Sequence, residues 1–358
     1  MALHFHSLQI CSIEHETVDS VTIGFHIPDD LKSLYKYIQG QNITLKTTID
    51  GKEVRRTYSI CKAPYENEIC IAIKKIPEGL FSNYALHELK VNDYLDVLPP
   101  TGKFYTPLDA LQQKNYVAFA AGSGITPIFS IIKQTLKAEP KSTFTLVYGN
   151  KTKNSTLFFE ALEGIKNTYL QRFNLIHVLS KEVTDTDIHS GRIDAHKLEQ
   201  LQRLIDYKSI HEFFLCGPQA MIFTIKDFLL ERGVPMNHIH FELFGTSYLQ
   251  TKKATEINTN AALMPKSNIT IKLDGRMFSF ELANNEQNIL DAALENGADL
   301  PFACKGGVCC TCKAKLIEGE VSMDVNYALE ADEVANGFIL SCQSHPISKS
   351  VVIDFDQR

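Results

Sequence analysis

Four of the chain's nine cysteines fall within nine consecutive positions, in the segment CKGGVCCTC. Cys304, Cys309 and Cys312 have the spacing CxxxxCxxC, and Cys342 follows in the later segment LSCQ. This is the ligand spacing of plant-type 2Fe–2S clusters, in which four cysteine thiolates hold two irons. These four residues are therefore predicted to be the ligands of a one-electron centre.

The residues between these cysteines suit a tight metal-binding loop. Gly306 and Gly307 lack a Cβ, so they are predicted to let the backbone bend and its amides approach sulfur. Cys310 in place of Cys309 would give CxxxxxCxC, which matches no ligand pattern, so Cys310 is predicted to be a small packed residue. Four thiolates also suit structural zinc, but zinc sites usually draw their ligands from two short hooks, and only Cys309 and Cys312 form one. An iron–sulfur cluster is the favoured interpretation.

A group of residues nearer the N-terminus suits a flavin. In RRTYSI, the Arg56 guanidinium suits a pyrophosphate, the Tyr58 ring can lie on an isoalloxazine, and the Ser59 hydroxyl can hydrogen-bond to the flavin. In GLFSNY, a predicted helix start offers free amides to phosphate. Each segment alone also fits ordinary strand alternation, but both resemble the FAD motifs of the ferredoxin-NADP reductase superfamily. The FAD contacts that this resemblance implies are Arg56, Tyr58, Ser59, Ile73, Lys74, Gly79, Phe81, Ser82, Thr126, Glu242 and Phe244.

Two further segments suit a pyridine dinucleotide. AAGSGITP follows a buried apolar run and opens a helical pattern, which places side-chain-free backbone at a helix N-terminus, where phosphates bind. Its spacing, GxGxxP, lacks the third glycine of the usual fingerprint and, together with LCGPQAMI, resembles the reductase superfamily. The coenzyme contacts implied are Gly122, Ser123, Gly124, Thr126, Pro127, Asn150, Lys151, Ser180, Lys181, Arg192, Cys216, Gly217, Pro218 and Met221.

Basic side chains at two predicted strand ends favour NADPH over NADH. Lys151 in YGNKT and Lys181 in VLSKE follow consecutive strands, where this superfamily binds the adenosine phosphate, and Arg192 is a third candidate. No acidic residue ends the second strand, as recognition of the NAD ribose would favour. The alternative is that these are ordinary solvated side chains. We expect NADPH, although Lys151 stands where the resemblance implies arginine.

The elements that must position these residues fall into three regions. Residues 1–108 show the alternation of half-buried strands and are predicted to form an antiparallel β-barrel that binds FAD. Residues 109–246 alternate short apolar runs with helical patterns, which predicts a doubly wound α/β domain for NAD(P)H. Residues 247–266 are polar and without a period, which is typical of a linker. Residues 267–358 open with a hairpin and resemble a plant-type ferredoxin domain, which implies a β-grasp fold.

Length and composition limit the alternatives. A chain of 358 residues is predicted to contain two or three domains, and 44% hydrophobic with 22% charged residues is typical of a soluble globular protein. A net charge of −6 without a dense Lys/Arg stripe argues against nucleic-acid binding. The sequence shows no secretory signal pattern and no apolar run approaching about 18 residues, so we expect a cytoplasmic protein with no membrane partner.

Over essentially its full length, the chain resembles the reductase components of bacterial phenylacetyl-CoA epoxidase complexes. The resemblance is carried by RRTYSIC, AAGSGITP, CKGGVCCTCKAKL, NYALEADE, LSCQ and VVIDFDQ. It implies a role in phenylacetate catabolism, with electrons passing from NADPH through FAD and the 2Fe–2S cluster to a separate di-iron oxygenase component, and no catalytic side chain beyond the cofactors. Two alternatives stay open: a reductase serving another oxygenase, hydroxylase or desaturase, and a non-catalytic, zinc-bearing interaction protein.

Overall fold

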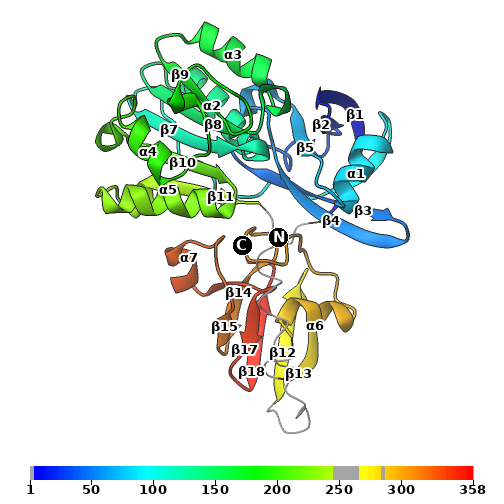
Figure 1. Cartoon of the computed structure of the whole chain (residues 1–358). Coiled ribbons are helices and arrows are strands. Elements are labelled where there is room, and N and C mark those ends of the chain that lie inside the picture. The colour runs from blue at the N-terminus through cyan, green and yellow to red at the C-terminus, as the bar shows by residue number, and fades with distance from the viewer. Residues whose placement is uncertain (1–3, 245–265, 284–286, 358) are drawn as a thin grey trace. The chain divides into compact units, whose positions relative to one another are not determined.

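The computed structural model describes residues 4–244, 266–283 and 287–357 (Figure 1). The chain divides into two compact units, one of residues 7–54 and 58–244 and the other of residues 1–6, 55–57 and 245–358. The linker predicted for residues 247–266 lies outside the described residues, except for Lys266, which begins a strand. Within the described ranges, we find no helix with the length and apolar character to cross a membrane.

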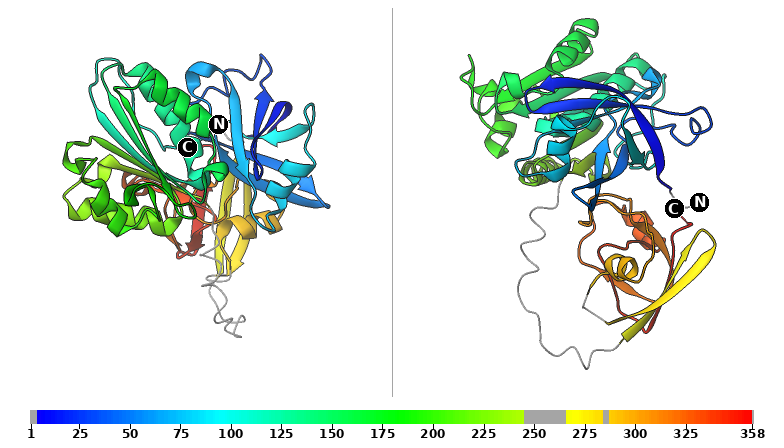
Figure 2. Two further views of the ribbon diagram at one scale, coloured as in Figure 1. Left: turned by 45° about the horizontal axis from the view of Figure 1, so that its top comes forward. Right: turned by 90° about the vertical axis from the view of Figure 1, so that its right-hand side faces the viewer.

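The first six strands form the predicted antiparallel barrel. They are β1 (His6–Thr17), β2 (Ser20–His26), β3 (Asn42–Ile49), β4 (Lys52–Ser59), β5 (Ile69–Lys74) and β6 (Tyr94–Val97), with helix α1 (Leu80–His87) between the last two. The strand order is β4-β3-β6-β1-β2-β5, and an antiparallel bridge between Ile60 and Ile71 joins the two ends of the sheet. The blue and cyan strands in Figure 2 enclose a core rich in isoleucine, leucine and valine.

The second half of the larger unit is a parallel sheet with helices on both faces (Figure 1). Its strands are β7 (Asn115–Ala121), β8 (Thr143–Asn150), β9 (Phe173–Leu179), β10 (Glu212–Gly217) and β11 (Ile239–Leu243), and its helices are α2 (Ile125–Ala138), α3 (Phe159–Thr168), α4 (Ala195–Leu201) and α5 (Gln219–Glu231). The order β11-β10-β7-β8-β9 reverses between β7 and β10. Ligands of doubly wound sheets bind beyond the carboxyl ends of the strands at such a reversal.

The C-terminal region has the mixed sheet of a β-grasp domain. Its strands are β12 (Lys266–Leu273), β13 (Arg276–Ala283), β14 (Lys313–Glu318), β15 (Val321–Met323), β16 (Phe338–Leu340), β17 (Ser344–Pro346) and β18 (Ser350–Asp354), and its helices are α6 (Ile289–Glu295) and α7 (Ala331–Ala335). The main sheet has the order β13-β12-β18-β14-β16, in which β12 and β18 are parallel. The predicted two-residue hairpin turn is confirmed, because Asp274 and Gly275 have φ angles of 52° and 71°.

Short 3-10 turns complete the larger unit. They are η1 (Pro64–Glu66), η2 (Gly122–Gly124), η3 (Lys153–Ser155), η4 (Asp187–His189), η5 (Tyr207–Ser209) and η6 (Met236–His238). Two of them matter for the sites described below: η2 leads directly into α2, and η1 lies in the connection between β4 and β5.

Candidate sites for flavin, nicotinamide coenzyme and iron–sulfur cluster

The four predicted cluster ligands come together in the small unit. Cys304, Cys309 and Cys312 lie on the loop between α6 and β14, and Cys342 lies just after β16. The Sγ atoms of Cys304 and Cys309 are 3.2 Å apart, and the thiols of Cys312 and Cys342 are hydrogen-bonded. Hydrogen bonds from Cys309 and Cys342 lower the pKa of Cys304, which favours its thiolate. The four thiols therefore contact one another in the order Cys309, Cys304, Cys342, Cys312, which suits a cluster that four cysteines share.

Within residues 4–244, 266–283 and 287–357, no group of three or more His, Cys, Asp or Glu side chains is arranged to hold a metal ion. The four cysteine thiols described above are the candidates for a two-iron cluster, which four cysteines share.

The backbone of the cluster loop bends with a positive φ at Gly307, as predicted, but not at Gly306. The Gly306 N–H donates to Cys304 Sγ at 3.3 Å, so an amide does approach a ligand sulfur. Gly307 has a φ of 72°, and a Cβ there would lie 3.0 Å from Val325 Cγ2 and 3.1 Å from the Val325 carbonyl oxygen. Lys305 also has a positive φ, 49°, which its residue type did not predict. The loop is therefore held tightly around the sulfurs, with no room for a side chain at position 307.

Two residues beside the ligands have separate roles. Cys310 donates its thiol to the Ala328 carbonyl oxygen at 3.2 Å and packs against the core of the small unit, as predicted for a packed residue. Gln343 was missed by the sequence reasoning. Its Nε2 donates to the Lys305 carbonyl at 3.1 Å and lies 3.5 Å from Cys342 Sγ, so it ties the two ligand-bearing segments together. The only signal was its place directly after Cys342.

Strand β4 places the predicted flavin residues in a row. The Arg56 side chain is exposed, Tyr58 is half-buried with its ring 5.7 Å from that of Phe81, and Ser59 is buried. The Arg56 guanidinium lies at the surface, where it donates to the Arg55 carbonyl oxygen, and the Tyr58 ring packs against the barrel core. Both suit FAD, the first through its pyrophosphate and the second through its ring system.

The side chains of the second predicted flavin loop face inwards. Phe81 is 1% exposed in the barrel core, and the Ser82 hydroxyl accepts from Ile76 N and donates to the Gly79 carbonyl. Ile73 is also fully buried. Gly79 precedes α1 without a side-chain cap, so the first amides of α1 are the groups that this loop can offer to a phosphate. Contacts from these positions would therefore come from the main chain.

Glu242 on β11 is joined to the barrel by hydrogen bonds. Its Oε2 accepts from Ser59 Oγ and its Oε1 from Asn42 Nδ2, each at 3.2 Å. Removal of water from the carboxylate raises the pKa of Glu242 to about 7, and the two hydrogen bonds oppose this shift. Asn42 was not predicted, because nothing in the sequence relates two positions 200 residues apart. Phe244, the next predicted residue on this segment, is 40% exposed.

The predicted dinucleotide loops lie side by side at the strand-order reversal. β7 and β10 are paired in parallel, with Cys216 opposite Ala120, so the loops GSG and CGP leave the same edge of the sheet. Gly122 has a φ of 55°, and a Cβ there would enter open space. Helix α2 starts without a side-chain cap. The Ile125 N–H is already hydrogen-bonded to the carbonyls of η2, so the open backbone at Gly122, where η2 begins, is the part of this loop that fits a pyrophosphate.

Close packing explains the remaining residues of these loops. A Cβ on Gly124 would lie 2.2 Å from the Cys216 carbonyl oxygen, so glycine is required where α2 meets β10. Thr126 is 3% exposed and donates to the Ser123 carbonyl oxygen at 3.0 Å. Pro127 is also buried, and Pro218 caps α5. Cys216 is fully buried and Met221 is 9% exposed, beside Gly217. The buried side chains shape the loops, and the main chain at Gly122 remains open.

The predicted phosphate-binding residues also share one edge of the sheet. β8 and β9 pair in parallel, and beyond them Ser180 N donates to the Asn150 carbonyl and Lys181 N to the Lys151 carbonyl, both at 2.9 Å. Residues 179 and 190 form a bridge, which brings Arg192 to the same edge. The side chains of Lys151, Lys181 and Arg192 are exposed. Three exposed cationic residues therefore follow the strand ends at the edge where the sequence predicts an adenosine phosphate.

Comparison with known proteins identifies the family. A protein that forms part of 1,2-phenylacetyl-CoA epoxidase in Escherichia coli (strain K12) is 44% identical over 355 residues, covering 99% of this chain and 98% of that protein. This chain belongs to the same family. The ferredoxin reductase component of 3-ketosteroid-9-alpha-monooxygenase from Rhodococcus rhodochrous is 29% identical and covers 97% of this chain and 96% of its own length.

Family profiles and a solved structure agree with this assignment. Residues 7–105 match the oxidoreductase FAD-binding domain, residues 119–227 the oxidoreductase NAD-binding domain, and residues 271–346 the 2Fe-2S iron-sulfur cluster binding domain. The structure of phthalate dioxygenase reductase, described as a modular structure for electron transfer from pyridine nucleotides to [2Fe-2S], aligns with a TM-score of 0.59 at 26% identity and 98% coverage of both chains. This member of the epoxidase component family is an oxidoreductase with FAD, NAD and 2Fe–2S domains.

Replacing Glu242 with glutamine is expected to remove a pH dependence of stability. The folded-state pKa of about 7 exceeds the ordinary value of 4.5, so the folded protein binds this proton more tightly than the unfolded chain. The carboxylate therefore lowers stability as pH rises from about 4.5 to 7, by up to about 3 kcal/mol above that range. Urea unfolding of the FAD-loaded proteins at pH 5, 6, 7 and 8 measures this. We expect E242Q to gain stability over the wild type as pH rises, and a constant difference would refute the assignment.

Proposed function

We propose that this chain is the NADPH-dependent reductase component that supplies electrons to the di-iron oxygenase component of a phenylacetyl-CoA epoxidase in phenylacetate catabolism. The observation that carries the proposal is the 44% identity, over nearly the whole of both chains, to the E. coli epoxidase protein. The mutual contact of the four thiols, three on the loop between α6 and β14 and one after β16, supports the redox role independently of that likeness. We place the protein in the cytoplasm.

The predicted site residues would bind the coenzyme and FAD and position them relative to each other. The open backbone of Gly122, at the start of η2, would hold the coenzyme pyrophosphate. Arg56 and the first amides of α1 would hold the FAD pyrophosphate, with Tyr58 against the ring system. When bound, FAD accepts two electrons from a nicotinamide and can release them singly to a one-electron centre. Glu242 and Ser59 would hold a proton beside the flavin ring.

The four cysteines would hold the cluster, from which electrons would pass to the partner protein. Cys304, Cys309, Cys312 and Cys342 supply four thiolates, and the Gly306 amide hydrogen bond to sulfur stabilises the reduced, more negative state. None of the described site residues is assigned to a phenylacetyl-CoA substrate. The role of the chain ends with the delivery of electrons to its partner.

The coenzyme is proposed to be NADPH because of the cationic edge formed by Lys151, Lys181 and Arg192. Lys181→Ala is expected to raise the KM for NADPH about tenfold and leave that for NADH unchanged, since a charge-assisted hydrogen bond contributes roughly 1.5 kcal/mol. Steady-state flavin-dependent reduction of ferricyanide with each coenzyme measures both constants. Lys208→Ala, at an exposed lysine in η5, is the matched control. Equal effects of K181A on the two coenzymes would contradict NADPH recognition at this edge.

Reconstitution with a purified oxygenase tests the partner. The chain is mixed with the oxygenase component of a phenylacetyl-CoA epoxidase, and NADPH oxidation and epoxide formation are followed with phenylacetyl-CoA. Turnover that depends on the chain and requires both components is the expected result. The second candidate, a reductase of another oxygenase, hydroxylase or desaturase, has support in the 29% identity to the 3-ketosteroid-9-alpha-monooxygenase component. Faster turnover with that oxygenase than with the epoxidase would favour it.

A further inference from the structure

The connection between β4 and β5, residues 61–68, joins the two halves of the larger unit. Strand β5 is buried on both faces: Ile71 belongs to the barrel core, whereas Cys70 and Ala72 belong to the core that contains α2. β4 carries the predicted flavin residues, and the loop before α2 carries the predicted dinucleotide residues. The boundary between the β4–β5 connection and α2 therefore lies between the predicted flavin site and the predicted dinucleotide site.

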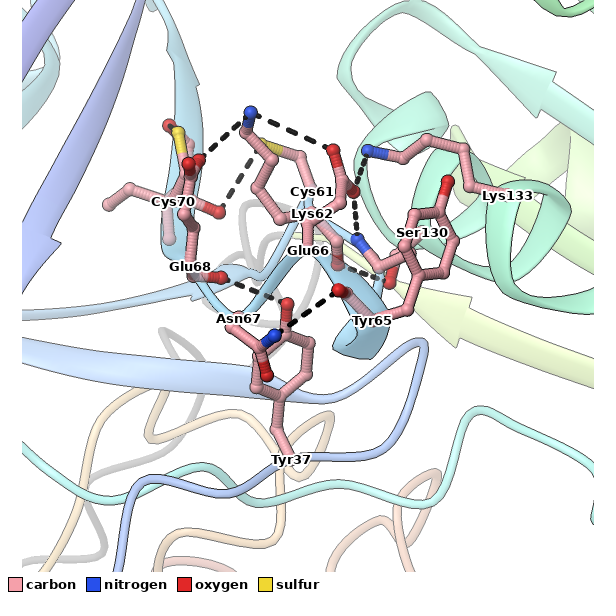
Figure 3. A network of polar contacts seen from close by, with 12 residues as sticks. Tyr37, Cys61, Lys62, Tyr65, Glu66, Asn67, Glu68, Cys70, Ser130 and Lys133 are labelled. Carbon is pink, nitrogen blue, oxygen red and sulfur yellow. Dashed lines mark hydrogen bonds and ion pairs between the residues drawn. The ribbon is translucent and has the colours of Figure 1, made fainter. Parts of the chain in front are cut away.

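A polar network crosses this boundary (Figure 3). The Lys133 ammonium on α2 forms an ion pair with the Glu66 carboxylate, which also accepts from Ala63 N and so closes the turn η1. One turn earlier on α2, Ser130 Oγ donates to the Lys62 carbonyl oxygen at 2.6 Å. Helix α2 is thus attached to the β4–β5 connection at two successive turns, by a charged contact and a neutral one.

The place of this network beside a cavity allows it to fix the position of α2 relative to the β4–β5 connection. Lys133 and Glu66 are 10% and 22% exposed in their side chains, and both line a cavity of about 680 Å³ between the barrel and the α/β sheet. Cys61 and Cys70 line the same cavity and pack into the core that contains α2, so the network lies at the edge of that apolar packing. Partly buried ion pairs contribute little net stability, but they can specify geometry. Lys133 is further held over the Phe129 ring, 4.3 Å from its centroid.

The Tyr65 N–H also donates to Gln134 Oε1 on α2, at 3.4 Å, whereas two other polar contacts between the barrel and the α/β half involve predicted flavin residues. Lys74 Nζ donates to the Ser155 carbonyl oxygen at 2.6 Å, and Glu242 accepts from Ser59. A change at either would alter a predicted flavin contact directly. Neither Lys133 nor Glu66 is among the predicted contacts of any cofactor, so their influence can be measured separately.

We infer that Lys133 and Glu66 are positioning residues, which hold α2 against the β4–β5 connection and so set the approach of the nicotinamide to the flavin. This inference rests on the proposed reductase function. Lys133 lies seven residues, or about 10 Å, along α2 from Thr126 at the dinucleotide loop. A rigid helix transmits a shift at one end to the other, and a misplacement of about 1 Å can cost up to about 100-fold in rate.

The test is Lys133→Met, which removes the ammonium and keeps the length of the side chain. Stopped-flow reduction of bound flavin by NADPH is expected to slow at least about tenfold, with a weaker long-wavelength charge-transfer band. Hydrogen exchange of residues 61–68, measured without coenzyme, is expected to increase. Light-driven reduction of the flavin and the following reduction of the cluster should keep wild-type rates, because these steps do not use the nicotinamide site.

Three variants make the result specific. Lys137→Met, an exposed lysine one turn further along the same helix, should match the wild type in every measurement. Lys133→Arg should restore most of the rate by keeping the ion pair, and Ser130→Ala should show a smaller defect of the same kind. The inference is overturned if K133M retains the wild-type rate of flavin reduction, or if K133M and K133R are equally slow. Failure of the wild type itself to be reduced by either coenzyme would instead refute the proposed function.

Discussion

Cys342→Ser is expected to abolish electron delivery to any one-electron acceptor while leaving reduction of the flavin by coenzyme intact. Cys342 is 2% exposed and its thiol is hydrogen-bonded to that of Cys312, so it would supply its thiolate to the cluster from within the packed core. A serine hydroxyl stays protonated where a thiolate is required. Loss of a ligand should cost more than the 10- to 100-fold typical of outer-shell changes, so we expect a fall of over about 100-fold in cytochrome c reduction.

Cys310→Ser is the matched control for that experiment. The same chemical change is made two positions before a ligand, at a thiol that donates to the Ala328 carbonyl oxygen and packs in the core. A serine hydroxyl can make the same hydrogen bond, so iron content and cytochrome c reduction should stay within about twofold of the wild type. If C310S lost the cluster and C342S kept it, the ligand assignment would be wrong.

Gly124→Ala is expected to have the largest effect on the coenzyme site. The added Cβ would meet the Cys216 carbonyl oxygen at 2.2 Å and the Gly217 nitrogen at 2.8 Å, and both are main-chain atoms that cannot rotate away. Helix α2 must then move off β10, which separates the two loops of the dinucleotide site. We expect a loss of about 3 kcal/mol in stability, at the upper end for overpacking, and at least a tenfold weaker affinity for NADP+. Urea unfolding and equilibrium titration measure the two effects.

The same substitution at Gly164 in α3 gives the comparison. Here the added Cβ meets no atom within 4 Å, and the residue lies inside a helix. Alanine should therefore stabilise the protein by about 0.5 to 1 kcal/mol and leave coenzyme affinity unchanged. Similar behaviour of G124A and G164A would show that close packing of α2 on β10 is not what requires glycine.

The spacing of the cluster ligands and the doubly wound character of the second sheet were predictable because each depends on short-range patterns. The spacing of Cys304, Cys309 and Cys312 defines a loop in which the ligands lie a few residues apart, and a nearby hairpin identifies its domain. The alternation of apolar runs and helical patterns likewise predicts parallel strands, because right-handed crossovers leave few other arrangements. The local sequence is therefore enough to predict the cluster ligands and the parallel strands.

Contacts between distant segments were not predictable. Asn42 and Ser59 meet Glu242, and Lys133 meets Glu66, only because β11 and α2 pack against the barrel. Nothing in the periodicity of either partner indicates the other. Phe81 shows a further limit: its place in a flavin motif predicts a cofactor contact, but its side chain lies in the barrel core, so such a contact would come from its main chain. Motif position indicates where a ligand lies, but burial decides which atoms can touch it.

The central claim is that electrons enter from a nicotinamide coenzyme and leave through the cluster. An anaerobic visible spectrum of the purified protein, titrated with NADPH and in parallel with NADH, tests it most directly. We predict flavin and iron–sulfur absorption that bleaches with about three electron equivalents, two for FAD and one for the 2Fe–2S cluster. A colourless protein that contains zinc in place of iron, or a spectrum that neither coenzyme bleaches, would contradict the claim.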